Sequence, residues 1–123
     1  MFKSRLFYVK IYRNRMEVIN LDTEQKISRE SDHKFSTNRI ILAEFPTATA
    51  FLSSILEEVD TQRSLFGQRK FVIQQFPKPY DALTGIEKTA LKEITEHCKG
   101  ITVNVVDQEQ ELTIAQALKE VIQ

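Results

Sequence analysis

The chain has 123 residues, of which 41% are hydrophobic and 28% are charged, and this size and composition predict a single globular domain with one core. Its 17 basic and 17 acidic residues balance, which argues against nucleic acid or an anionic membrane as the main partner. With one cysteine, no signal-peptide pattern and no apolar run near the roughly 20 residues that span a bilayer, we expect a cytoplasmic protein without an internal disulfide or an integral membrane segment.

The first part of the chain predicts a β-hairpin. Residues 6–12 (LFYVKIY) and 16–21 (MEVINL) are rich in β-branched and aromatic side chains, and the break between them contains Asn14. Both faces of the first run are mostly apolar, which is typical of a central strand covered on both sides. A short edge strand at 25–29 and a polar loop at 30–39 are expected to follow.

The middle of the chain predicts an amphipathic helix. Pro46 fits its first turn, and Thr47 or Thr49 is a candidate N-cap. Apolar residues then recur at helical spacing, namely Ala48, Phe51, Leu52, Ile55, Leu56 and Val59. In the polar connection that follows, Leu65 and Phe66 either pack under the loop or contact a protein partner.

From residue 70 onward, strand-like and helix-like segments alternate, which predicts parallel strands joined by crossover helices. The first of these helices carries a T-x-x-E capping box, Thr84 with Glu87, and Gly100 is expected to take the left-handed conformation at its end. A strand at 101–106 and a last helix at 111–122 follow. The buried face of the first helix is predicted to comprise Ile86, Ala90, Leu91, Ile94 and Cys98.

The predicted order of elements, β-β-β-α-β-α-β-α, indicates an α/β fold with a mixed five-stranded sheet and helices on both faces. This is the outline of the ribonuclease H-like fold, which the actin superfamily shares. On this interpretation, residues 1–123 form one actin-like half-domain.

Two segments resemble MreB, the bacterial rod-shape homologue of actin. IILAEFPTATAFLSSILEEV (40–59) is similar to a family segment that runs V-I-A-D-F-D-x-T-x-x-M-L-x-x-x-I-x-x-V. FVIQQFPKPYDALTGIEKTALKEITEHCKGITVNVVDQEQELTIAQAL (71–118) is similar to the next one. There a strand ending in V-P and a loop precede a T-x-V-E-R-R-A helix start, and a strand ending in I-E-E-P and an Ala-rich helix follow. The shared order of these motifs implies the first subdomain of an actin-like protein.

The resemblance implies a nucleotide site that this sequence does not support. Actin-like ATPases bind nucleotide between two halves, and the opening hairpin of the first half supplies a D-x-G-T loop. Here Lys10 falls at about the Asp position and Tyr12 at about the Gly position, which disfavours both a metal ion and close backbone approach to phosphate. The three glycines of the chain, Gly67, Gly85 and Gly100, cannot form a glycine-rich phosphate loop. We therefore expect no cofactor.

Few residues remain as catalytic candidates. Glu87 aligns with the family's water-activating glutamate, although the capping box explains it, and Asp81 and Asp107 follow strand ends, where sites in α/β sheets gather. His33 has no partner at metal-ligand spacing, and Cys98 lies on an apolar helix face. These patterns favour a solvated histidine and an inert core thiol, so we expect no metal site and no enzyme.

Three hypotheses about function follow. The first is a non-catalytic protein-interaction or scaffold module related to MreB-like cytoskeletal proteins, which acts in bacterial cell shape or envelope assembly. Its sheet edges, the Leu65–Phe66 loop or the terminal helix would contact a protein partner or a second copy of the chain. The second is a nucleotide-binding ATPase-type protein whose site, with Glu87 and Asp107, is completed by oligomerisation or a partner. The third is a nucleic-acid module that uses Lys10, Arg13 and Arg15, and it predicts an affinity that falls steeply with salt.

Overall fold

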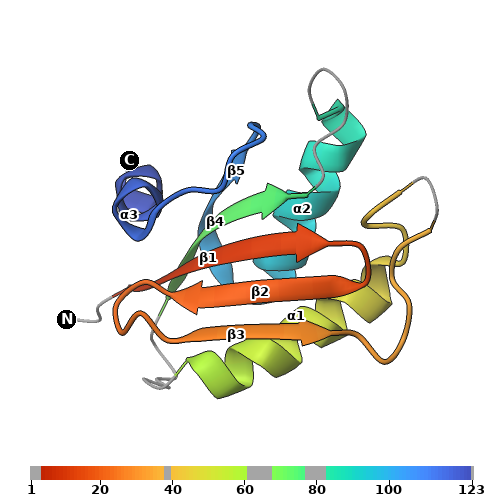
Figure 1. The fold of residues 1–123 in the computed structure, drawn as a ribbon, viewed down its shortest axis with the longest axis horizontal. Helices are drawn as coiled ribbons and strands as arrows, with labels where there is room; N and C mark the ends of the chain where they lie inside the picture. Colours follow the sequence, from red (N-terminus) through yellow and green to blue (C-terminus); the bar gives the residue numbers. More distant parts are fainter. Residues whose placement is uncertain (1–3, 38–39, 61–67, 77–82, 123) are drawn as a thin grey trace.

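The computed structural model describes residues 4–37, 40–60, 68–76 and 83–122. Figure 1 shows a single sheet with helices on either side of it. The elements are β1 (Arg5–Tyr12), β2 (Arg15–Asn20), β3 (Lys26–Glu30), α1 (Phe45–Val59), β4 (Arg69–Gln75), α2 (Gly85–His97), β5 (Gly100–Val106) and α3 (Ile114–Ile122). The order of elements predicted from the sequence is confirmed.

The five strands form one open, mixed sheet in the order β3-β2-β1-β4-β5. β1 is antiparallel to β2 and parallel to β4, β2 and β3 are antiparallel, and β4 and β5 are parallel. α1 and α2 cover one face and α3 covers the other (Figure 1). The predicted α/β architecture is therefore confirmed, and the carboxyl ends of β1, β4 and β5 lie together at one end of the sheet.

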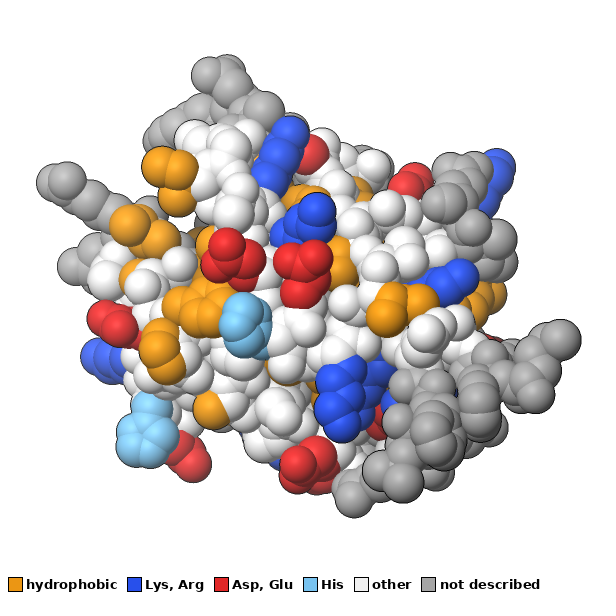
Figure 2. Space-filling model, turned by 180° about the vertical axis from the view of Figure 1, so that it is seen from behind, with side chains coloured by type: hydrophobic (Ala, Val, Ile, Leu, Met, Phe, Trp, Pro, Cys, Tyr) orange, Lys and Arg blue, Asp and Glu red, His pale blue; other side chains and the backbone are white. Residues whose placement is uncertain are grey.

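β1 lies at the centre of the sheet because both of its faces are apolar. Phe7, Val9 and Ile11 are fully buried on the side of α1 and α2, and Tyr8 is fully buried on the side of α3. The cluster under α1 and α2 is the larger of the two. Figure 2 shows the molecule from behind, where the surface carries small groups of hydrophobic side chains separated by charged ones.

The start of α1 differs from the prediction. Glu44 occupies the N-cap position without a side-chain cap bond, so neither Thr47 nor Thr49 caps the helix, whereas Pro46 lies in the first turn as expected. Phe35, in the segment predicted to be a polar loop, is fully buried, and its carbonyl accepts a hydrogen bond from the Glu44 N–H at 2.9 Å. One aromatic side chain thus attaches this loop to the core and sets the direction in which α1 begins.

The capping box predicted at the start of α2 is confirmed. The N–H of Glu87 donates to Oγ1 of Thr84 at 3.1 Å, and the N–H of Thr84 donates to Oε1 of Glu87 at 2.9 Å. Leu91 and Ile94 are fully buried as expected. Ile86 was wrongly assigned to the buried face, because 84% of it is exposed.

The turn between α2 and β5 differs from the prediction made for Gly100. Lys99, with φ of 69°, adopts the left-handed conformation that the sequence suggested for Gly100. Gly100 is required for a different reason, since a Cβ at this position would lie 2.7 Å from Cδ2 of Phe71 and 2.8 Å from the carbonyl oxygen of Thr95. The small residue lets β5 approach α2 and β4 closely.

Candidate functional site

The carboxyl ends of the parallel strands, where sites in α/β sheets gather, hold a charged cluster centred on Lys10. The Lys10 side chain is 8% exposed, and its Nζ lies 2.7 Å from Oε2 of Glu17 on β2 and 2.8 Å from Oε1 of Glu111 in the segment before α3. Lys26 on β3 lies 3.6 Å from the other oxygen of Glu17. In these four residues, which we call the Lys10 cluster, two ammonium groups balance two carboxylates.

A chain of hydrogen bonds beside the Lys10 cluster joins the sheet to the segment before α3. The hydroxyl of Tyr8 donates to Oε1 of Gln74 and accepts from the N–H of Leu112 at 3.1 Å. Nε2 of Gln74, a fully buried residue, donates to the carbonyl oxygens of Gln108 at 3.0 Å and Gln110 at 2.8 Å. The segment that carries Glu111 is therefore held in place by two side chains of adjacent strands.

Burial and ion pairing oppose each other at Lys10. Burial disfavours its charge, but the hydrogen bonds to Glu111 and Glu17 outweigh burial and raise the pKa of Lys10 above its usual value. The hydrogen bond from Lys10 lowers the pKa of Glu111. Burial raises the pKa of Tyr8 and of Tyr12, so both phenols are neutral at physiological pH.

This arrangement does not suit a divalent cation. Both carboxylates of the Lys10 cluster are bonded to ammonium groups, and an ammonium nitrogen at the centre would repel Mg²⁺. In residues 4–37, 40–60, 68–76 and 83–122, no group of three or more His, Cys, Asp or Glu side chains could hold a metal ion.

The position of Lys10 also argues against the nucleic-acid hypothesis, which needs Lys10, Arg13 and Arg15 on one surface. Lys10 is buried rather than available to a nucleic acid. Arg13 donates to the carbonyl oxygen of Thr37, and Arg15 stacks over the ring of Tyr12 at 3.8 Å. The three cations of the nucleic-acid hypothesis therefore do not form one exposed patch.

The two weak catalytic candidates both lie near the start of α2. Glu87 forms the capping box described above, and the carboxylate of Asp107, just after β5, accepts from the N–H of Leu83 at 3.3 Å. Oδ2 of Asp107 also lies 3.7 Å from Nζ of Lys88. These bonds fix the beginning of α2 against the end of β5. The other candidates, Asp81, Leu65 and Phe66, lie outside the described residues.

A second charged cluster lies at the opposite end of β1 and was not predicted from the sequence. Oδ2 of Asp60, just after α1, accepts hydrogen bonds from Nε of Arg5 at 2.7 Å and from Nε of Arg69 at 3.0 Å. Nη1 of Arg69 donates to the carbonyl oxygen of Cys98 at 3.0 Å. We call Arg5, Asp60 and Arg69 the Asp60 cluster. Its position, far from the carboxyl ends of the strands, indicates a structural role.

Cys98 is buried next to this cluster, as the sequence predicted. It is 3% exposed, and burial raises the pKa of its thiol to about 11. A thiol with so high a pKa is almost fully protonated at physiological pH and is a poor nucleophile. The expectation of a core cysteine is confirmed.

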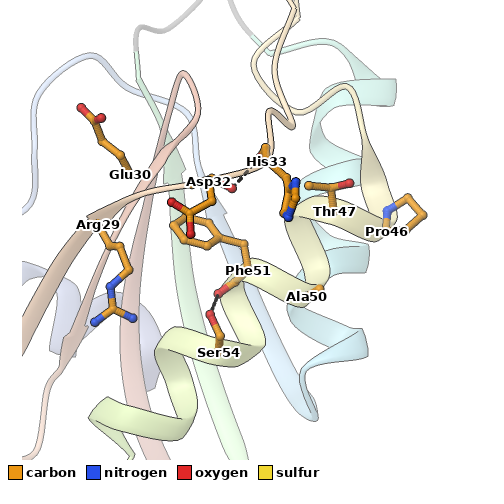
Figure 3. Close-up of a pocket in the computed structure, with 10 residues that line it drawn as sticks. Arg29, Glu30, Asp32, His33, Pro46, Thr47, Ala50, Phe51 and Ser54 are labelled. Carbon is orange, nitrogen blue, oxygen red and sulfur yellow. Dashed lines mark hydrogen bonds between the residues drawn. The ribbon is translucent and has the colours of Figure 1, made fainter.

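A surface hollow of about 670 Å³ lies between the end of β3 and α1. Figure 3 shows His33 and Thr47 on one side of it, Phe51 at its base and Arg29 on the other side. Arg29 is already paired with Glu58, its Nη2 lying 3.0 Å from Oε1. His33 is exposed, in keeping with the expectation of a solvated side chain. The hollow therefore offers one aromatic surface, and Glu30 and Asp32 add two carboxylates to its lining.

Several residues of these clusters were missed because their partners are distant in sequence. Glu111 meets Lys10 across 101 positions and Asp60 meets Arg5 across 55. One signal was available: a two-residue turn after Tyr12 places Lys10 directly opposite Glu17 in the hairpin register.

Comparison of the chain with protein-family models, with curated proteins and with solved structures gives no match. Among the described residues, none of the helices has the length and apolar character that crossing a bilayer requires. Inferences about function consequently rest on the sequence patterns and on the geometry described above.

Proposed function

We propose that the chain is a non-catalytic protein-interaction or scaffold module, built on a ribonuclease H-like, actin-like half-domain and related to the MreB-like proteins of the bacterial cytoskeleton. The order of its strands and helices agrees with this proposal. On the same reasoning its place of action is the cytoplasm, where cell shape or envelope assembly would be its process.

One observation carries the non-catalytic part of the proposal. By the resemblance to MreB, Lys10 falls at about the position on the first strand where an actin-like ATPase needs an acid, and its Nζ is bonded to two carboxylates within 2.8 Å. A phosphate chain could contact Lys10 only if Glu17 and Glu111 released it, and both acids would then repel the phosphate. The tyrosine at position 12 adds bulk where close backbone approach would be needed.

The alternative is an ATPase-type protein whose nucleotide site is completed by a second chain. Isothermal titration of the protein with Mg-ATP, and separately with Mg-ADP, distinguishes the two. We expect no heat of binding beyond dilution at protein concentrations of about 100 µM, which would reveal any affinity in the micromolar range. Saturable micromolar binding of either nucleotide would overturn the proposal.

A positive test of the interaction role uses the native cell. The tagged full-length chain is expressed at its natural level, crosslinked and purified, and the co-purifying proteins are quantified by mass spectrometry. We expect one or a few stoichiometric protein partners that remain after nuclease treatment. Recovery of the chain alone, or of nucleic acid that is lost steeply with salt, would contradict this function.

A further inference from the structure

The two edges of the sheet differ in the features that keep edges from pairing. β3 (KISRE) carries three charged residues among its five, and Lys26 and Arg29 are engaged in ion pairs with Glu17 and Glu58. β5 (GITVNVV) has seven residues, none of them charged and none a proline. Natural edge strands usually carry charges or prolines that prevent pairing with another chain. The β5 edge lacks both.

No strand within residues 4–37, 40–60, 68–76 and 83–122 pairs with the outer side of β5. In the part of the chain that the structure describes, β5 is the last strand of the sheet and pairs only with β4. Ile101 lies where the register between β4 and β5 shifts, and it is 53% exposed. Beyond this irregularity, the five residues from Thr102 to Val106 run in regular register. Val103 and Val105 are only partly buried against the core, so an added strand would complete their coverage.

The surface beside this edge is basic. The ion pair of Lys88 with Asp107, at 3.7 Å, shows that this side of α2 faces the end of β5. Lys92 and Glu96 follow at four-residue spacing and share that side of the helix, and Lys99 is exposed immediately before β5. Neither Lys92 nor Lys99 forms an ion pair with a described residue. Three lysines and two acids, Glu96 and Asp107, thus flank the edge, and they leave a net charge of +1.

The other flank of β5 carries little charge directed at the edge. Nδ2 of Asn104 donates to the backbone carbonyl of Glu120 on α3, and Lys119 and Glu120 are both exposed on that helix. These two opposite charges cancel in their effect on a partner. The electrostatic preference of the edge is therefore set by the α2 side.

We propose that β5 accepts an extended acidic segment of a partner protein, which adds as a sixth strand with acidic side chains toward Lys92 and Lys99. Main-chain hydrogen bonds to β5 supply affinity, and alternating side chains supply specificity. A second copy of the chain is a poorer occupant, because a symmetric β5–β5 pair would bring the two lysine rows against each other. This inference rests on the proposed interaction function and names the surface and the chemistry of the partner.

The probe is a fluorescein-labelled nine-residue peptide in which Val and Glu alternate, with a Val/Lys peptide of equal length as its counterpart. We expect saturable binding of the Val/Glu peptide at concentrations up to about 1 mM by fluorescence anisotropy, and none of the Val/Lys peptide. In ¹⁵N-labelled protein, the amide shifts should change from 101 to 106 and not from 26 to 30.

Reversing the charges of Lys92 and Lys99 tests whether these lysines select an acidic peptide. The double variant Lys92→Glu/Lys99→Glu is expected to weaken Val/Glu binding about tenfold or more and to gain binding of the Val/Lys peptide. Lys34→Glu, a single charge reversal at an exposed position after β3 at the opposite edge of the sheet, serves as the control for a change in net charge and should keep the wild-type preference. Circular dichroism confirms that all variants are folded.

Three results with the purified protein would overturn the proposal: no binding at the highest peptide concentration, binding that the double variant leaves unchanged, or a dimer in sedimentation in which the 101–106 amides are protected. Different results would contradict the proposed interaction function itself, namely micromolar binding of Mg-ATP or recovery of the chain alone from cells. If native partners were captured equally by wild type and the double variant, the interaction role would stand and the β5 assignment would fall.

Discussion

β1 has a buried charged cluster at each end, and the two clusters are built in opposite ways. The Asp60 cluster places one fully buried carboxylate between two arginines, whereas the Lys10 cluster places one buried ammonium between two carboxylates, of which Glu111 is 57% exposed. The Asp60 carboxylate is shielded from water, and among the described residues only its Oδ2 has hydrogen-bond partners, whereas Glu111 can exchange Lys10 for water. The first cluster is thus a rigid structural contact, and the second is the place where the structure can loosen.

The largest effect is expected at the rigid contact. Asp60→Asn leaves two arginines facing a neutral side chain, and we expect it to lower the free energy of unfolding by about 3–5 kcal/mol, as for other broken buried ion pairs. Urea denaturation followed by circular dichroism measures this change. Glu58→Gln, which breaks the exposed pair with Arg29, is the control and should not shift the midpoint measurably. Equal midpoints for the two variants would remove the contrast between buried and exposed pairs.

A smaller loss is expected at the Lys10 cluster. Lys10→Met leaves Glu17 buried without its main partner, but Glu111 can turn to solvent, so we expect a loss of about 2 kcal/mol in the same urea assay. The double variant Lys10→Met/Glu17→Gln should recover part of the loss, because no unpaired charge then remains buried. A loss as large as that of Asp60→Asn would show that the two clusters are equally rigid.

Alkaline pH should lower the stability of the fold through groups at both ends of β1, namely Tyr8 and Lys10 at the Lys10 cluster and Cys98 beside the Asp60 cluster. The folded-state pKa values of Tyr8 and Lys10 are raised, and that of Cys98 is raised to about 11, so the unfolded state releases these protons first. The stability they contribute is complete below their ordinary pKa values and is lost as the pH rises through the folded ones. We expect the urea midpoint to fall from about pH 9 to 11.

The groups responsible can be separated by substitution. Cys98→Ala should remove the earliest part of the alkaline decline, and Tyr8→Phe a later part, when the midpoints of the variants are compared at pH 8, 9, 10 and 11. A midpoint independent of pH over this range would contradict the assignment.

The smallest effect is expected outside both clusters, at the start of α2. Thr84→Ala removes one half of the capping box and should cost about 1 kcal/mol. Glu87→Gln should cost less, because the amide oxygen of glutamine can still accept the N–H of Thr84. These values set a scale against which the two clusters are compared in the same urea assay. A larger cost for Glu87→Gln than for Thr84→Ala would indicate a further role for the Glu87 charge.

The sequence was most informative where structure is determined locally. The apolar side chains on both faces of β1 and the Thr84–Glu87 spacing depend on a few neighbours, and both predictions are confirmed. Phe35 and Asp60 were missed because their burial depends on which distant segments fold over them. The same holds for Glu111, which contacts Lys10 only after α3 has reached the opposite face of the sheet.

The unequal coverage of the sheet has a consequence for how the molecule opens. α3 has nine residues, and among the described residues its fully or almost fully buried side chains are Ala117 and Val121. The opposite face of the sheet is covered by two longer helices, α1 and α2, which pack over a larger hydrophobic cluster. Local opening follows the least buried contact area, so the amides of α3 should exchange with deuterium before those of α1 and α2. When α3 detaches from the sheet, Tyr8 and Val72 become exposed. Proteases and quality-control factors would then reach the chain first at this face, while the rest of the fold stays intact.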